Sequence, residues 1–167
     1  LNGLGVSDDG SQAFGVLPAA QGSGRTIYRH DRASETATAL GAGAASTPVT
    51  HGAVNPVNGF YYYGGFSGGT VQVYGFDTTP NPSIGLVASG TIPTGGGNGD
   101  WVFDQQGRMY VVGGASGSNV VSVIDQQIPT SGPAITVTGR QITDIATPSN
   151  QAINGIAFAG SGLLYLA

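Results

Sequence analysis

The fold of this chain is decided by the stretch Phe60-Tyr61-Tyr62-Tyr63-Gly64-Gly65, an aromatic run that follows a glycine turn and ends in a glycine doublet. An aromatic residue just after a glycine turn, inside a short apolar run, recurs along the chain at Phe14, Tyr62, Tyr110 and Tyr165. The chain is therefore built from repeats of roughly fifty residues, a period typical of the blades of a β-propeller. We expect these four aromatic residues to occupy equivalent buried positions.

Each repeat begins with an Asn-Gly or His-Gly pair and reaches a turn glycine eight or nine residues later, at positions 10, 59, 107 and 162. Glycine suits such a turn because it tolerates positive φ. Runs of β-branched and aromatic residues around the turns predict short strands and no helix. The predicted strands are residues 4–6, 13–16, 26–31 and 36–40, then 53–55, 60–63, 71–77 and 84–92, then 101–103, 109–112, 120–125 and 135–142, and finally 156–158 and 163–166.

The fold class predicted from this pattern is all-β, a β-propeller of four-stranded antiparallel blades with about three and a half blades present. Residues 1–167 form one partial propeller, with blades at about 2–49, 50–97 and 98–148 and an incomplete blade at 150–167. Propellers close with four to eight blades, and open blade edges invite pairing. The expected partners are therefore the remaining propeller blades or a second copy of the chain.

Composition excludes several functions. The net charge is −4, and the five basic residues are all arginines, scattered at positions 25, 29, 32, 108 and 140, so we expect no nucleic-acid partner. The absence of lysine excludes Schiff-base chemistry and a conventional P-loop, and the absence of cysteine excludes disulfides and thiol chemistry. No apolar run approaches the length of a transmembrane helix, so we expect no membrane insertion.

The glycine doublets Gly64-Gly65 and Gly113-Gly114 follow apolar strands and precede strands rich in valine. This pattern resembles the kelch repeat, although the first repeat lacks the doublet and Trp101 lies in a first strand rather than late in the blade. The low-charge, lysine-free style is similar to that of propellers in secreted or surface proteins of high-GC Gram-positive bacteria. The resemblance implies a secreted or cell-surface location.

A ligand is expected at the channel face where first strands begin, and the tentative binding residues there are His51, Asn98, Asp100 and Asn154. Two interpretations remain open for them. The Asn-Gly and His-Gly pairs can be turn residues whose side chains bond to backbone, or they can form a polar ring that holds water, a cation or a sugar hydroxyl. The sequence predicts no metal site and no cofactor, apart from a structural cation that this ring leaves open.

Other polar residues are expected to be structural. Asp8 and Asp9 lack further acids at EF-hand spacing and are read as turn residues, whereas the acids at positions 31, 77 and 125 recur at the ends of third strands as turn caps. The string Gly-x-Ser-x-Gly around Ser67 matches a nucleophile elbow, but it lies between two predicted strands, so we expect no nucleophile there. Tyr61 and Tyr63 are expected to pack between blades, with stacking on sugar rings as the alternative.

Two classes of function follow. The sequence favours a non-enzymatic secreted or surface module that acts as a scaffold or binds a protein or glycan ligand, because it predicts no catalytic residues and no paired acid and base in one cleft. The alternative is an extracellular carbohydrate-active propeller enzyme, a glycosidase or lyase, whose catalytic residues lie partly outside this chain.

Overall fold

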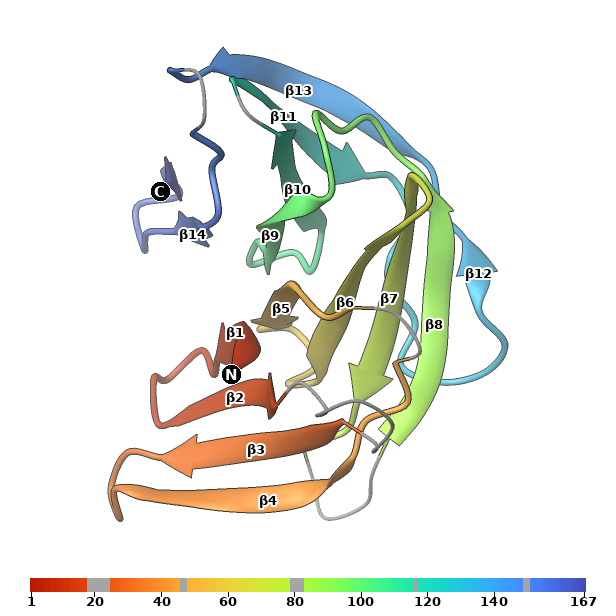
Figure 1. Ribbon diagram of the computed structural model, residues 1–167. Coiled ribbons are helices and arrows are strands. Elements are labelled where there is room, and N and C mark those ends of the chain that lie inside the picture. Colours follow the sequence, from red (N-terminus) through yellow and green to blue (C-terminus); the bar gives the residue numbers. More distant parts are fainter. Residues whose placement is uncertain (18–24, 46–47, 79–82, 116, 149–150) are drawn as a thin grey trace.

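The computed structural model describes residues 1–17, 25–45, 48–78, 83–115, 117–148 and 151–167. The part described consists of strands and turns, with no helix (Figure 1). The strands form four sheets, and they pair antiparallel except at one short parallel contact. This arrangement confirms the predicted all-β class.

The first sheet contains β1 (Asn2–Val6), β2 (Gln12–Leu17), β3 (Thr26–Asp31) and β4 (Thr36–Ala42). The second contains β5 (His51–Val54), β6 (Tyr61–Ser67), β7 (Thr70–Phe76) and β8 (Ser83–Thr91), with β12 (Ile135–Thr136) as a fifth strand. The third contains β9 (Asn98–Phe103), β10 (Met109–Ala115), β11 (Ser118–Ile124) and β13 (Gly139–Ala146), and the fourth is the hairpin of β14 (Ile156–Phe158) and β15 (Leu164–Leu166).

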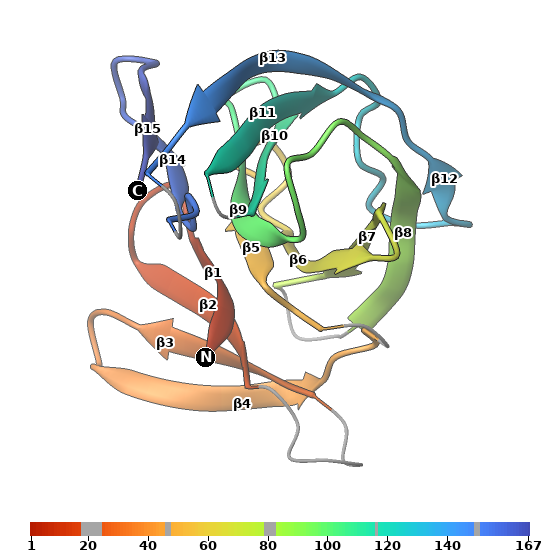
Figure 2. The ribbon, with the colours of Figure 1, turned by 45° about the horizontal axis from the view of Figure 1, so that its top comes forward.

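These sheets are arranged around a common axis, so the fold is propeller-like (Figure 2). Each sheet runs in chain order from a first strand near the axis, β1, β5, β9 or β14, to a last strand at the periphery. The first strands of neighbouring sheets also contact one another. Residues that face the axis from four separate parts of the sequence are thereby brought together.

Glycine closes the turn between the first and second strands of every sheet, as the sequence predicts. The four turn glycines Gly10, Gly59, Gly107 and Gly162 have φ between 68° and 81°. This left-handed region is one that a residue with a Cβ enters only at a cost. Each repeat of about fifty residues therefore needs a glycine at this turn, because the backbone there has positive φ.

The glycine doublets have a steric reason. The backbone N–H of Thr50 donates to the carbonyl of Gly64, and that of Gly95 donates to the carbonyl of Gly113, so the segment entering each sheet crosses the end of its second strand. A Cβ on Gly65 would lie 2.8 Å from the carbonyl oxygen of Pro48. The doublets in the second and third sheets leave space for this crossing.

Alternate residues of β6 fill two different inter-sheet cores. Tyr61 and Tyr63 stack on each other with ring centroids 5.5 Å apart, and Tyr61 also stacks on Phe14 of the first sheet. Tyr62 points the other way and packs against Phe103 of the third sheet. All three tyrosines are fully buried, which confirms that Tyr61 and Tyr63 pack between sheets and removes them as sugar-stacking residues.

The recurring aromatic residues are equivalent in register but not in burial. Phe14, Tyr62, Tyr110 and Tyr165 each pair with a residue of the first strand of their own sheet. Phe14 and Tyr62 are buried and Tyr110 is half-buried, but 59% of Tyr165 is exposed. The prediction of four buried rings is therefore wrong for Tyr165, because the first three are covered by a following sheet, and no sheet of the described chain follows β15.

The predicted strand 135–142 is wrong as a single element. Ile135 and Thr136 form β12, which pairs in parallel with β8 of the second sheet, and only from Gly139 does the chain join the third sheet. Ile128 and Val137, which flank β12, are buried in the core between the two sheets. The chain pairs with the second sheet here because this places the two apolar side chains in the core between the sheets. The alternation of residues along a strand does not reveal that core from the sequence.

Candidate functional site

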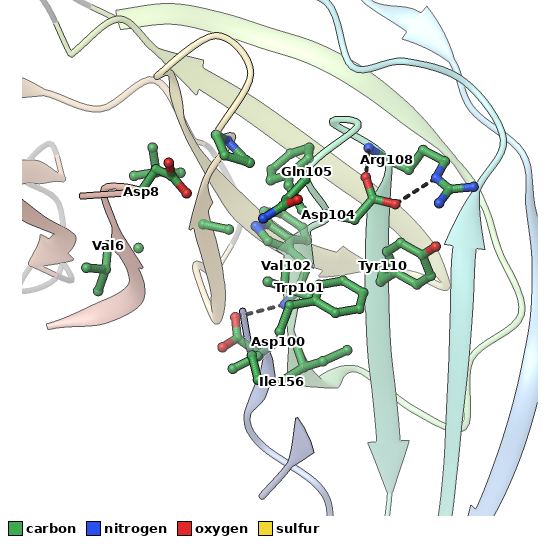
Figure 3. A pocket seen from close by; sticks show the side chains of 18 of the residues that line it. Val6, Asp8, Asp100, Trp101, Val102, Asp104, Gln105, Arg108, Tyr110 and Ile156 are labelled. Carbon is green, nitrogen blue, oxygen red and sulfur yellow. Dashed lines mark hydrogen bonds and ion pairs between the residues drawn. The ribbon is translucent and has the colours of Figure 1, made fainter. Parts of the chain in front are cut away.

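A cavity of about 860 Å³ lies along the axis, between the first strands of the four sheets (Figure 3). Its walls are formed by β1, β5, β9 and β14, and it extends to the turns that follow them. The walls therefore expose main-chain groups of edge strands together with a few polar side chains. A concave surface with a small number of converging polar groups is the usual form of a ligand site.

Asp100 is a partly buried polar side chain in this wall. It lies on β9, and its Oδ1 accepts hydrogen bonds from the backbone N–H of Trp101 at 2.9 Å and from that of Gly52 at 3.2 Å. The second bond crosses from the third sheet to the second. Burial raises the pKa of the Asp100 carboxyl to about 7, against the opposing effect of these two N–H donors. Near neutral pH, Asp100 is thus present both as an acid and as a carboxylate.

The end of the cavity at the β9–β10 turn carries an ion pair. Asp104 Oδ2 accepts a hydrogen bond from Arg108 Nε at 2.7 Å, while its Oδ1 accepts from the backbone N–H groups of Gln106 and Arg108, both at 2.9 Å. Hydrogen bonding to Asp104 raises the pKa of the Arg108 guanidinium further. Both carboxylate oxygens of Asp104 are therefore occupied, one by the backbone of its own turn and the other by Arg108.

Aromatic rings form the apolar part of the wall. Tyr110 meets Phe158 edge to face with centroids 5.1 Å apart, and both rings are half-buried. Trp101 is almost fully buried, and its indole N–H donates to the carbonyl of Tyr62. The cavity thus combines the partly buried carboxyl of Asp100, a polar rim that holds the Asp104–Arg108 ion pair, and partly exposed aromatic rings.

Of the four binding residues that the sequence predicts, only Asp100 lines this cavity. Asn98 and Asn154 are exposed at the start of their sheets and lie outside the lining. His51 is fully buried, with Trp101 and Phe66 against its ring and its Nδ1 2.6 Å from Thr50 Oγ1. Burial lowers the pKa of His51 to about 4, so the ring is neutral at physiological pH. The four residues therefore do not line one cavity together, and their binding roles remain predictions.

Several rim residues were missed by sequence reasoning, namely Asp104, Gln105, Gln106 and Arg108. They belong to the turn after a first strand, at the opposite end of the strands from the face that the sequence analysis selected. The acid ahead of a turn glycine was the available clue. Such an acid is a weak clue, because it usually closes the turn, as Asp104 does here.

The remaining acids behave mainly as structural groups. Asp9 Oδ1 accepts hydrogen bonds from the backbone of Ser11 and from the hydroxyls of Ser7 and Ser11, which lower the pKa of Asp9 to about 2. Asp31 Oδ1 accepts from two backbone N–H groups of its turn, which confirms a turn cap there. Asp125 lies 3.5 Å from Arg140 in an exposed ion pair instead. Among the described residues, no three His, Cys, Asp or Glu side chains could hold a metal ion together.

Ser67 has the environment of a hairpin turn and not of a nucleophile. It ends β6, and the next two residues, Gly68 and Gly69, have φ of 57° and 81° before β7 begins at Thr70. Two successive positive φ values match a two-residue β-hairpin turn. The strand-to-helix setting of a nucleophile elbow is absent from this segment, so the Gly-x-Ser-x-Gly match is coincidental.

The sheets and the axial cavity define a propeller-like all-β protein. Among solved structures, the chain is similar to TolB from Acinetobacter baumannii, with 16% sequence identity and a TM-score of 0.49 over 96% of this chain and 35% of that chain. The chain thus spans about a third of the length of TolB. No protein-family model matches this chain, and no curated protein matches it. Within the described ranges, no helix is long and apolar enough to cross a membrane.

Proposed function

We propose that this chain is a non-enzymatic propeller module that binds a ligand in the axial cavity. The observation that carries the proposal is the cavity wall itself, in which Asp100 presents a buried carboxyl beside half-buried aromatic rings. Such a wall offers apolar contact area and one strong polar anchor, which is what a specific binding site needs. The parent protein is a secreted or surface-associated one in this proposal, supported by the low charge and the absence of lysine.

The arrangement of carboxyl groups supports binding over catalysis. Both oxygens of Asp104 are occupied by its turn and by Arg108, so Asp104 is a poor proton donor or nucleophile. The other carboxylate of the lining, Asp8, is exposed at the turn after β1. Asp100 is therefore the one partly buried carboxyl of the lining that is not engaged by an arginine, whereas glycoside hydrolysis uses two carboxyl groups in complementary roles.

The test of this proposal is to fill the cavity. Ala157 lies on β14 in the cavity lining and its side chain is exposed, so Ala157→Trp places a large ring in the site without disturbing a core. We expect a panel of oligosaccharides and peptides to contain a ligand that raises the melting temperature of the native protein and not that of Ala157→Trp. The matched control is Ala33→Trp, on an exposed turn far from the lining. A ligand that stabilises all three proteins equally would refute the axial site.

A second candidate function is an extracellular carbohydrate-active enzyme, a glycosidase or lyase. The observation that favours it is the pKa of Asp100 of about 7, which suits a general acid at neutral pH. Its second catalytic group would come from outside the residues described here. Cleavage of aryl glycosides or polysaccharides that is lost in Asp100→Asn, while Ala33→Trp cleaves normally, would establish this function in place of the first.

The finer assignment of the fold belongs to the same proposal. We take the repeats to be kelch-like, about three and a half blades of a larger ring that the remaining blades or a second copy complete. The glycine doublets within β6 and β10 support the kelch-like assignment, and exposed Leu1, Leu4 and Leu17 on the outer face of the first sheet support a further neighbour there.

A further inference from the structure

No positively charged side chain of the described residues pairs with Asp100. One oxygen of this carboxyl is held by two backbone N–H groups from neighbouring sheets, which sets the orientation of the group in the cavity wall. The sequence contains no lysine, and of the five arginines only Arg108 lines the cavity, where Asp104 engages it. When Asp100 ionises, its negative charge is thus left unpaired in a partly buried position, which is costly.

The other titratable groups around Asp100 do not supply a positive charge. His51, on β5 next to Gly52, is neutral because burial lowers its pKa to about 4. Tyr61 of β6 interacts electrostatically with Asp100, and its own pKa is raised well above the usual value, chiefly by burial. Asp8 at the β1 turn adds negative charge at the rim, Asp104 and Arg108 at the β9 turn offset each other, and from β14 the lining has no charged side chain.

The surroundings suit a cation better than an anion or a neutral polyol. The half-buried rings of Tyr110 and Phe158 lie in the same wall, and aromatic faces attract alkylammonium and guanidinium groups. Exclusion of water by these rings strengthens the pull of a nearby carboxylate on a cation. An anionic ligand would instead meet the acids Asp8 and Asp100, because the charges of Asp104 and Arg108 offset each other.

We propose that the axial cavity binds an organic cation, a ligand with an alkylammonium or guanidinium group, and that Asp100 is its counter-charge. This inference rests on the proposed binding function and narrows it to one chemical class. The cation pairs with the free oxygen of the carboxylate, and its alkyl part contacts the rings of Tyr110 and Phe158. Either a small amine or a Lys or Arg side chain of a protein ligand supplies this chemistry.

The pairing predicts how affinity depends on pH. The cation binds the carboxylate and not the neutral acid, so affinity follows the ionised fraction of Asp100. With a pKa of about 7 for this carboxyl, that fraction rises about 30-fold between pH 5.5 and pH 8.0. Binding of a neutral ligand that accepts a hydrogen bond from the protonated acid would weaken over the same range, so the sign of the pH dependence separates the two classes.

The experiment uses the fluorescence of Trp101, the single tryptophan of the sequence, whose backbone N–H bonds to Asp100. The probes are n-butylammonium and ethylguanidinium, with n-butanol and methyl glucoside as neutral probes. We expect saturable shifts with the two cations only, and an affinity that rises about 30-fold from pH 5.5 to 8.0. In Asp100→Asn, which retains an oxygen for both N–H donors, the affinity should stay at the low-pH level throughout.

The control variant is Asp144→Asn, which removes one carboxylate from the exposed outer strand β13 and should keep the full pH dependence. An acetylated and amidated Gly-Arg-Gly peptide identifies the source of the cation: tighter binding than ethylguanidinium indicates a protein side chain, and equal binding indicates a small amine. Saturable binding of methyl glucoside without the cations would overturn the inference and leave the binding function standing. A lack of response to every probe would overturn the inference alone, because the cavity-filling variant Ala157→Trp tests the binding function separately.

Discussion

The substitution Asp100→Asn should stabilise the protein relative to the native chain, by an amount that grows as the pH rises. The amide oxygen can accept the same two hydrogen bonds, from Gly52 and Trp101, so the substitution removes the charge and little else. The pKa of Asp100 rises from 3.8 to about 7 in the folded protein, chiefly through burial. The folded state therefore holds this proton more tightly than the unfolded state does.

The sign and size of the effect follow from linkage. A carboxyl with a raised folded-state pKa contributes stability that is present below pH 3.8 and is lost as the pH rises through about 7. A shift of about three pH units corresponds to roughly 4 kcal/mol in total, at 1.36 kcal/mol per unit. Between pH 5 and pH 8 the loss is about 2 to 3 kcal/mol, and Asp100→Asn avoids it.

Urea unfolding followed by Trp101 fluorescence measures this difference directly. We expect the stability of Asp100→Asn relative to the native protein to increase by about 2 to 3 kcal/mol from pH 5 to pH 8. The control Asp144→Asn, which removes an exposed carboxylate, should track the native protein across the range. If the free energies of unfolding of the native protein and Asp100→Asn changed in parallel with pH, the argument would be refuted. Burial would then not disfavour the ionised form of Asp100.

Three further predictions follow from single positions. A Cβ at position 52 would lie 2.0 Å from the carbonyl oxygen of Gly3, so Gly52→Ala should force the first two sheets apart and lower the free energy of unfolding by about 3 kcal/mol or more, whereas Gly160→Ala, with nothing within 4 Å, should be close to neutral in the same denaturation assay. A fluorophosphonate probe should label the native protein and Ser67→Ala alike, since Ser67 ends a hairpin strand; labelling lost in the variant would contradict this. By carbon-detected NMR, the Asp9 carboxyl should titrate at about 2, and removing the hydroxyls of its serine neighbours should raise that pKa; an unchanged midpoint would show that these bonds do not hold the charge.

The sequence predicted the strands and turns well because their causes are local. The third strand of the first sheet was predicted as residues 26–31 and is β3, Thr26–Asp31, and the strand predicted at residues 156–158 is β14, Ile156–Phe158. A turn that needs positive φ calls for glycine wherever it occurs, and a strand that packs on one or both faces shows its period in a few residues. A repeat multiplies these local cues, so the arrangement of strands could be derived without knowing any contact.

The site could be predicted only in part. Asp100 was selected because it follows a repeated pair, and it does line the cavity, but His51 from the same pattern turns into the core between Trp101 and Phe66. The two side chains differ because the repeated pairs are one position out of register: His51 pairs with the first glycine of its doublet and Asn98 with the second. Strand residues alternate between faces, so this shift of one position exchanges the axis for the core. The turn residues Asp104 and Arg108 lie at the rim because the first strands of four sheets converge in space, and the sequence does not show that convergence.

The sequence by itself determined the all-β class, the repeat and the turn glycines, because backbone geometry and side-chain period act over a few residues. Only the tertiary structure decided which carboxyl is buried without a counter-charge, where β12 crosses to its neighbour's sheet, and why Tyr165 stays exposed. Each of these depends on segments tens of residues apart approaching within a few ångströms. Burial, the desolvation of a charge and the filling of a core are properties of that approach, and no single stretch of the chain encodes them.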